Sequence, residues 1–98
     1  MTTLSISRRA LSDVERFTDF LLEHDSQSAA RTLELIVSAL EVLRQHPYIG
    51  RLIEGGLREL MISRGRTGYV ALYKFDGVRD EVVIHEVRHQ LEAGYLTD

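Results

Sequence analysis

The chain has 98 residues, 44% of them hydrophobic, and these numbers predict one compact domain over residues 1–98. Its 15 acidic and 12 basic residues give a formal charge of −3, which argues against a protein that binds nucleic acid over its whole surface. The absence of cysteine and of an apolar N-terminal signal favours a cytoplasmic protein. No segment has the roughly 18 apolar residues needed to cross a bilayer, so we expect no membrane partner.

The first quarter of the chain predicts a strand followed by a helix. Apolar and polar residues alternate over residues 3–7, as in a short strand with one buried face. From Arg8 to about His24, apolar residues recur at helical spacing and define one stripe of an amphipathic helix. The stripe consists of Ala10, Val14, Phe17 and Leu21. Asp13 falls outside it, so we expect this side chain to face solvent.

A second helix is predicted from Asp25 or Ser26 to about Gln45. Asp25 or Ser26 can cap its first turn, and Pro47 ends it because proline has no backbone N–H. The short connection predicts an antiparallel helical hairpin. A second set of residues widens the apolar surface of this helix: Leu35, Ala39 and Val42. It suits either packing within the hairpin or docking of a partner helix.

The second half of the chain predicts three strands. After a loop rich in glycine, the hydrophobic period drops to two over about Leu57–Ser63, Gly68–Phe75 and Glu81–Arg88. The turn sequences between these runs favour an antiparallel meander. The predicted fold class is therefore α+β, with an N-terminal strand and an antiparallel helical hairpin packed on one face of a small antiparallel sheet that ends in the meander. No element remains to cover the other face, so we expect function there.

The segment His85-Glu86-Val87-Arg88-His89 matches the H-E-x-x-H motif of zinc proteases. That chemistry needs both histidines on one face of a helix, whereas Val82-Val83-Ile84 leads into the segment with strand character. Four residues of strand separate the two histidines by roughly 13 Å, too far for two ligands of one zinc ion. We predict neither a metal nor another cofactor.

Arg88, His89 and Tyr95 follow the core of the last predicted strand. These residue types can handle a phosphodiester, with arginine stabilising charge, histidine acting as acid or base and tyrosine donating a hydrogen bond. The simpler interpretation is a strand end with ordinary polar residues and no functional site. The spacing of the three residues by itself favours this interpretation.

Six short pieces of sequence, spread in order over nearly the whole chain, resemble the RelE/ParE family of toxins. They are Ser7-Arg8-Arg9-Ala10, His46-Pro47, Gly50-Arg51, Leu57-Arg58-Glu59-Leu60, Gly68-Tyr69-Val70-Ala71-Leu72-Tyr73 and Val87-Arg88-His89-Gln90. The resemblance implies the same strand, helix, helix and three-strand layout. It also implies the toxin of a type II toxin-antitoxin system, held silent in a hetero-oligomer by a cognate antitoxin that wraps its sheet and helices.

The resemblance leaves two mechanisms, and we favour a ParE-like, non-enzymatic inhibitor of DNA gyrase. The alternative is a RelE-like endoribonuclease that cuts messenger RNA on the ribosome, with Arg88, His89 and Tyr95 as a reduced active site. RelE-like enzymes tend to place an arginine where this chain has Val70, and the charge of −3 is unusual for docking onto ribosomal RNA. A third hypothesis is a harmless relative that serves only as a structural partner or co-repressor.

Gyrase inhibition implies an interaction surface, for which we predict arginines and tyrosines on or beside the meander. These types dominate the energetics of many protein interfaces. The predicted residues are Arg58, Arg64, Arg66, Tyr69, Tyr73 and Arg88. Tyr69 and Tyr73 share one face of their strand, and the sequence leaves open whether that face is buried.

Overall fold

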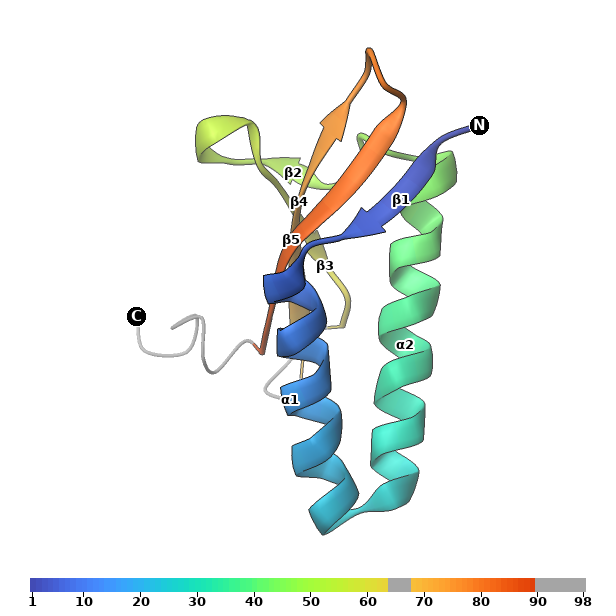
Figure 1. Ribbon diagram of the computed structural model, residues 1–98, viewed down its shortest axis with the longest axis vertical. Coiled ribbons are helices and arrows are strands. Elements are labelled where there is room, and N and C mark those ends of the chain that lie inside the picture. The colour runs from blue at the N-terminus through green and yellow to red at the C-terminus, as the bar shows by residue number, and fades with distance from the viewer. Residues whose placement is uncertain (64–67, 90–98) are drawn as a thin grey trace.

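The computed structural model describes residues 1–63 and 68–89. The described residues form two helices and five strands (Figure 1). They are β1 (Thr3–Ile6), α1 (Arg8–His24), α2 (Ser26–Gln45), β2 (Arg51–Leu52), a 3-10 turn (Glu54–Gly56), β3 (Arg58–Met61), β4 (Tyr69–Asp76) and β5 (Glu81–His89). The predicted opening strand, helical hairpin and three later strands are confirmed, and β2 and the 3-10 turn are additions.

The strands form one sheet in the order β1-β5-β4-β3-β2. The three later strands form the predicted antiparallel meander, but β1 pairs parallel to β5, with Ile6 opposite Ile84. The expectation of an antiparallel sheet is therefore wrong for β1. The reason is that α1 and α2 return the chain to the end of the sheet where β1 begins (Figure 1). As a result β3 runs in the same direction as β1. The chain reverses between β3 and β4 and again between β4 and β5, so β5 also runs in the direction of β1.

Side-chain caps fix where both helices begin. Ser7 Oγ accepts a hydrogen bond from Ala10 N at 3.0 Å, and Asp25 Oδ1 accepts one from Gln27 N at 3.1 Å. Hydrogen bonds from Ser28 to the Asp25 carboxylate lower the pKa of this group. Asp25 lies in the connection between the helices, so its cap fixes the residue at which the hairpin turns.

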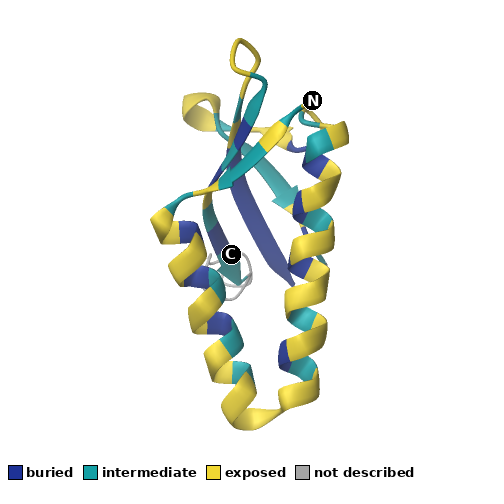
Figure 2. Cartoon of the chain, turned by 45° about the vertical axis from the view of Figure 1, so that its right-hand side comes forward, coloured by how far each residue is buried: buried dark blue, intermediate teal, exposed yellow. Residues whose placement is uncertain are grey.

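Both helices lie on one side of the sheet, and the core lies between them and that face (Figures 1 and 2). The buried residues of the core are Ala10, Phe17, Ile36, Leu40, Leu43, Ile62, Tyr69, Ala71, Tyr73, Val82, Ile84 and Val87. The end of the hairpin around residues 20–30 extends beyond the sheet and is mostly exposed (Figure 2). Neither described helix is long and apolar enough to span a membrane.

The opposite face of the sheet has no helix over it among the described residues, but its centre is not open. Val70 and Leu72 point to this face, and their exposed fractions are only 0% and 6%. Their neighbours in register have long side chains: Met61 and Arg88 beside Val70, Glu59 and Glu86 beside Leu72. The face that we expected to be bare thus presents the ends of charged side chains rather than a continuous apolar surface.

A bulge in β5 sets which of its side chains reach this second face. Leu72 pairs with Glu86 and Tyr73 pairs with Ile84, which leaves His85 as an extra residue. Beyond the bulge, Val87 joins the core, so Glu86 and Arg88 point to the opposite face.

Candidate functional site

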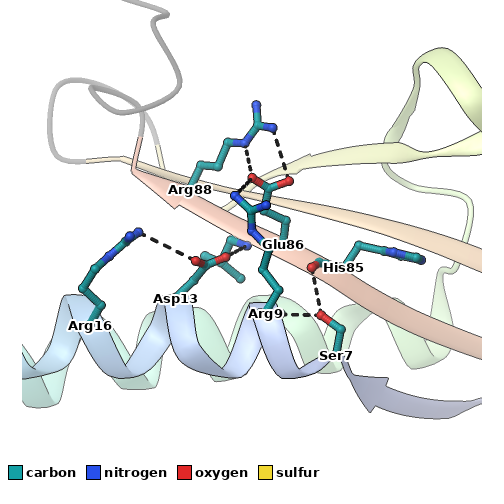
Figure 3. Close-up of polar contacts among 9 residues, drawn as sticks. Ser7, Arg9, Asp13, Arg16, His85, Glu86 and Arg88 are labelled. Carbon is teal, nitrogen blue, oxygen red and sulfur yellow. Dashed lines mark hydrogen bonds and ion pairs between the residues drawn. The ribbon is translucent and has the colours of Figure 1, made fainter.

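The first turns of α1 seal the free edge of β5. Pairing between β1 and β5 ends at Ile84, so no strand of the described residues lies beside the last residues of β5 on that side. Ser7 Oγ donates a hydrogen bond to the His85 carbonyl oxygen at 2.8 Å, and Asp13 Oδ2 accepts one from Val87 N at 3.0 Å (Figure 3). Backbone groups that would otherwise stay unpaired are satisfied by the helix.

Asp13 is the residue that the helical pattern misplaced. We expected it to face solvent, but only 7% of the residue is exposed, and Arg16 Nη2 lies 3.7 Å from its Oδ1. The prediction was wrong because hydrophobic periodicity records where apolar residues lie. It does not record that a nearby backbone N–H needs an acceptor.

A cluster of charges lies on the second face beside this edge, and we call it the Glu86 cluster: Arg9, Glu86 and Arg88. Arg88 binds the Glu86 carboxylate through two nitrogens, Nε to Oε1 at 2.7 Å and Nη2 to Oε2 at 3.2 Å. Arg9 Nη2 lies 2.9 Å from the same Oε1 (Figure 3). The side-chain hydrogen bonds from Arg88 are the main cause that lowers the pKa of Glu86, and the charge of Arg9 adds to them.

Arg88 and His89 do not converge. Arg88 pairs with Val70 and points to the second face, whereas His89 pairs with Tyr69 and points to the helix side. The His89 ring meets the Tyr69 ring edge-on, with centroids 5.1 Å apart. His85 and His89 lie within strand β5, so the strand interpretation of the H-E-x-x-H segment is confirmed. Tyr95, the third predicted residue of the ribonuclease alternative, lies outside the described residues.

Tyr69 and Tyr73 were expected at an interaction surface, and that expectation was wrong. Their exposed fractions are 7% and 0%, because both belong to the face of β4 that the helices cover. Tyr69 packs on Phe17 with ring centroids 5.2 Å apart. These aromatics form the core rather than a docking surface.

Tyr73 also organises a second polar arrangement, which we call the Tyr73 cluster: Pro47, Tyr48, Gly50, Arg58 and Tyr73. The Tyr73 hydroxyl donates to the Pro47 carbonyl oxygen and accepts from Gly50 N, both at 2.8 Å. Burial raises the pKa of this phenol. A Cβ at Gly50 would lie 2.7 Å from the Tyr73 ring, so the loop between α2 and β2 can approach β4 only because residue 50 is glycine.

Arg58, another predicted interface residue, holds the same loop. Its Nη1 donates to the carbonyl oxygens of Gly50 at 2.9 Å and Tyr48 at 3.2 Å. Its guanidinium also lies 5.0 Å from the centre of the Tyr48 ring. Arg58 is half-buried and has a clear structural role. Arg64 and Arg66, predicted with it, lie outside the described residues.

The predicted apolar stripe on α2 is partly exposed. Leu35 and Val42 are 42% and 41% exposed, whereas Ala39 packs against the core. Just beyond the stripe, the end of α2 and the following loop line a shallow cavity of about 470 Å³. Its lining residues are Gln45, His46, Pro47, Tyr48 and Ile49. The stripe and the cavity together leave apolar surface without a cover from the described chain.

Comparison with known proteins decides which family this arrangement represents. A family model described as the ParE toxin of the type II toxin-antitoxin system parDE matches residues 4–94. The chain belongs to this toxin family. The toxin is 37% identical over 92 residues to Toxin RelE3 of Caulobacter vibrioides, covering 94% of this chain and 98% of that protein. It is 34% identical over 90 residues to Toxin RelE1 of the same organism, covering 92% and 95%.

Two solved structures share the fold of the toxin. The chromosomal ParDE system from P. aeruginosa matches with a TM-score of 0.76 and 24% identity, over 91% of this chain and 96% of that chain. The intact E. coli RelBE toxin-antitoxin complex matches with a TM-score of 0.55 and 16% identity, over 89% and 94%. Two helices on a small β-sheet are therefore the shared architecture.

Several pieces of sequence that carry the family resemblance have structural roles in the toxin. Ser7 caps α1 and binds β5, while Gly50 and Arg58 belong to the Tyr73 cluster. Arg9 and Arg88 are different, because both bind Glu86 at the surface. The resemblance thus identifies the scaffold well and leaves the Glu86 cluster as the candidate for function.

Proposed function

We propose that the toxin is a non-enzymatic inhibitor of DNA gyrase that a cognate antitoxin neutralises. The observation that carries this proposal is the divergence of Arg88 and His89 to opposite faces of β5. The description of the matching family model as the ParE toxin supports the same choice.

Cleavage of a phosphodiester needs an acid or base and a charge-stabilising group at the same phosphate. Both must come within hydrogen-bond reach of the reacting atoms. Arg88 is on the second face with its guanidinium bound to Glu86, and His89 is against Tyr69 on the helix side. In this arrangement the two side chains do not face a common phosphate. This geometry favours a toxin that acts through contacts rather than catalysis.

The surroundings of Arg88 also disfavour a phosphate site. Val70 lies opposite Arg88, is completely buried, and stands where RelE-like enzymes tend to have an arginine. Glu86 supplies a negative charge beside Arg88, which weakens the attraction of a phosphate. The second face therefore combines arginines and carboxylates, a mixture that suits a protein partner better than a polyanion.

A toxin of a type II system has an antitoxin partner, and we place the antitoxin contact on α2. Leu35, Ala39 and Val42 follow one another at helical spacing. Leu35 and Val42 present apolar surface on the helix whose end lines the cavity at residues 45–49. A helix or extended segment of the antitoxin can bury this surface. Charged substitutions at Leu35 and Val42 should weaken the toxin-antitoxin complex and leave the free toxin folded, because both side chains are partly exposed.

The gyrase proposal is tested with the purified toxin in a DNA supercoiling assay. A molar excess of toxin over gyrase should block supercoiling, and prior addition of the antitoxin should restore it. The Leu35→Glu/Val42→Glu variant is a matched control, since it should inhibit gyrase but escape the antitoxin. Supercoiling that proceeds unchanged at a large excess of folded toxin would remove gyrase as the target.

A ribosome-dependent messenger RNA endoribonuclease is the second candidate. It is favoured by two relatives at 37% and 34% identity that are named RelE toxins. This function requires that the toxin cut ribosome-bound messages and that Arg88→Ala/His89→Ala abolish the cutting. Such a result would replace the gyrase proposal, whereas full toxicity of the double variant would eliminate the ribonuclease.

A further inference from the structure

Three arginines of the described residues, Arg9, Arg51 and Arg88, are bound by acidic residues of the second face. Arg51 Nη2 lies 2.9 Å from Glu59 Oε1 at one side, and Glu86 binds Arg9 and Arg88 at the other. Glu59 and Glu86 flank the same residue, Leu72, in the register of the sheet. The two carboxylates therefore occupy one row across three strands. Arg51 of β2 lies beyond Glu59 in that row, whereas Arg9 of α1 and Arg88, two residues further along β5, both bind Glu86.

Exposure differs sharply between the two kinds of side chain. The Glu59 and Glu86 side chains are 10% and 14% exposed, whereas Arg51, Arg9 and Arg88 are 73%, 69% and 40% exposed. The carboxylates thus lie low against the sheet and the guanidinium groups lie above them. Because the Arg88 hydrogen bonds lower the pKa of Glu86, this carboxylate stays ionised at neutral pH.

Without these two carboxylates, the same face would have the character of a nucleic-acid site. Among the described residues, Arg51 and Arg88 of the sheet and Arg9 of α1 would then be unpaired with these carboxylates, and arginine forms two parallel hydrogen bonds with phosphate. Binding of a polyanion gains free energy from counterions released when lysine or arginine neutralises its phosphates. An arginine already neutralised by a neighbouring carboxylate contributes less of this gain, and the carboxylate repels the phosphate.

We propose that Glu59 and Glu86 are specificity-determining residues that hold Arg9, Arg51 and Arg88 as internal ion pairs and thereby exclude nucleic acid from this face. The inference rests on the proposed function only in taking a protein as the toxin's target. A protein partner tolerates the pairs, because it can offer both donors and acceptors and can pack on the arginine stems. A strand of RNA or DNA offers mainly negative charge and is rejected.

The test compares variants for binding to a labelled RNA oligonucleotide and to labelled duplex DNA, by fluorescence anisotropy at several salt concentrations. Glu59→Gln/Glu86→Gln should bind both probes at least about tenfold more tightly than the wild-type toxin at low salt. The slope of log affinity against log salt should steepen by about one to two, as expected for one or two additional phosphate contacts. Adding Arg51→Gln and Arg88→Gln should remove the gain.

The matched control is Glu15→Gln/Glu34→Gln, which changes the net charge by the same amount on exposed positions of the two helices. It should leave nucleic-acid binding near the wild-type level. An equal gain in the control, tight binding by the wild-type toxin, or no gain in a double variant that melts like the wild type would each overturn the proposal. Gyrase is absent from this binding assay. A failure of the gyrase proposal would therefore appear only in the supercoiling assay and can be told apart from a failure of this inference.

Discussion

The Tyr73 cluster and the Glu86 cluster each hold an arginine of the meander, but with opposite kinds of partner. Arg58 in the first binds backbone carbonyl oxygens and an aromatic ring, next to a tyrosine that is fully buried. Arg88 in the second binds a carboxylate, and 40% of its side chain is exposed. The first arrangement fixes a loop to the sheet. The second leaves a charged pair at the surface, where another molecule can contact it.

The difference predicts that changes in the Tyr73 cluster affect stability, whereas changes in the Glu86 cluster affect recognition. The largest effect is expected for Gly50→Ala. Its Cβ would lie 2.7 Å from two atoms of Tyr73, which has no room to move, so the free energy of unfolding should fall by about 3 kcal/mol. Urea denaturation measures this value. Gly77→Ala is the control, because its nearest atoms are at 3.7 and 3.8 Å, and an equal loss there would contradict the account.

Tyr73→Phe should have the next largest effect. It removes the acceptor for Gly50 N and the donor to the Pro47 carbonyl, and leaves these groups without that partner in the interior. A loss of about 2 kcal/mol in the free energy of unfolding is expected. Tyr48→Phe should be nearly neutral, since the Tyr48 side chain is largely exposed. Similar stabilities for the two variants would show that the Tyr73 hydroxyl does not hold the loop.

Asp13→Ala should have an intermediate effect on stability. Asp13 is buried like the Tyr73 cluster, but it binds Val87, which lies between Glu86 and Arg88 in the chain. Val87 N would lose its acceptor, which should cost about 1 to 2 kcal/mol of unfolding free energy. Asp13→Asn should lose less unfolding free energy, since its amide oxygen can still accept the hydrogen bond from Val87 N. Hydrogen exchange at the Val87 amide offers a local measurement. If the Val87 amide is protected from exchange equally well in Asp13→Ala, Asp13 is not the group that protects the edge of β5.

The smallest effect on stability is expected at Glu86. The pKa of this carboxyl is lowered from its ordinary 4.5 in the folded state, so its ion pairs stabilise the fold above that pH. The stabilisation is lost as pH falls through the lowered pKa. Wild type and Glu86→Gln should therefore differ by no more than about 1 kcal/mol at neutral pH and converge in acid. Melting temperatures over a pH series check this, and a difference that grows in acid would contradict it.

The helices and the three main strands could be predicted because each contains a run of residues long enough to show its hydrophobic period. The sequence did not predict β2, whose two residues show no period, or the parallel pairing of β1 with β5, which depends on the path of the whole chain. The burial of Asp13 was missed for a related reason. Its partner Val87 is 74 residues away, and no local pattern connects them.

Of the Glu86 cluster, only Arg88 was among the residues predicted for a site, and Arg9 and Glu86 were not. Arg88 was correctly placed on the last strand, which was predicted to end at that residue. Because the strand continues through His89, the two side chains point to opposite faces. The low position of Glu86 beneath two arginines could not be read from the sequence, because Arg9 comes from a helix 77 residues earlier. Tyr69 and Tyr73 look like interface residues by type, and only the side on which the helices pack makes them core.

The most direct test of the account is toxicity of His89→Gln in cells that lack the antitoxin. The glutamine keeps polar bulk beside Tyr69 but cannot act as an acid or base. If the toxin acts by contacts and His89 lies away from the functional face, this variant should arrest growth as strongly as the wild type. A folded His89→Gln protein that no longer arrests growth would contradict the account and return His89 to an active site.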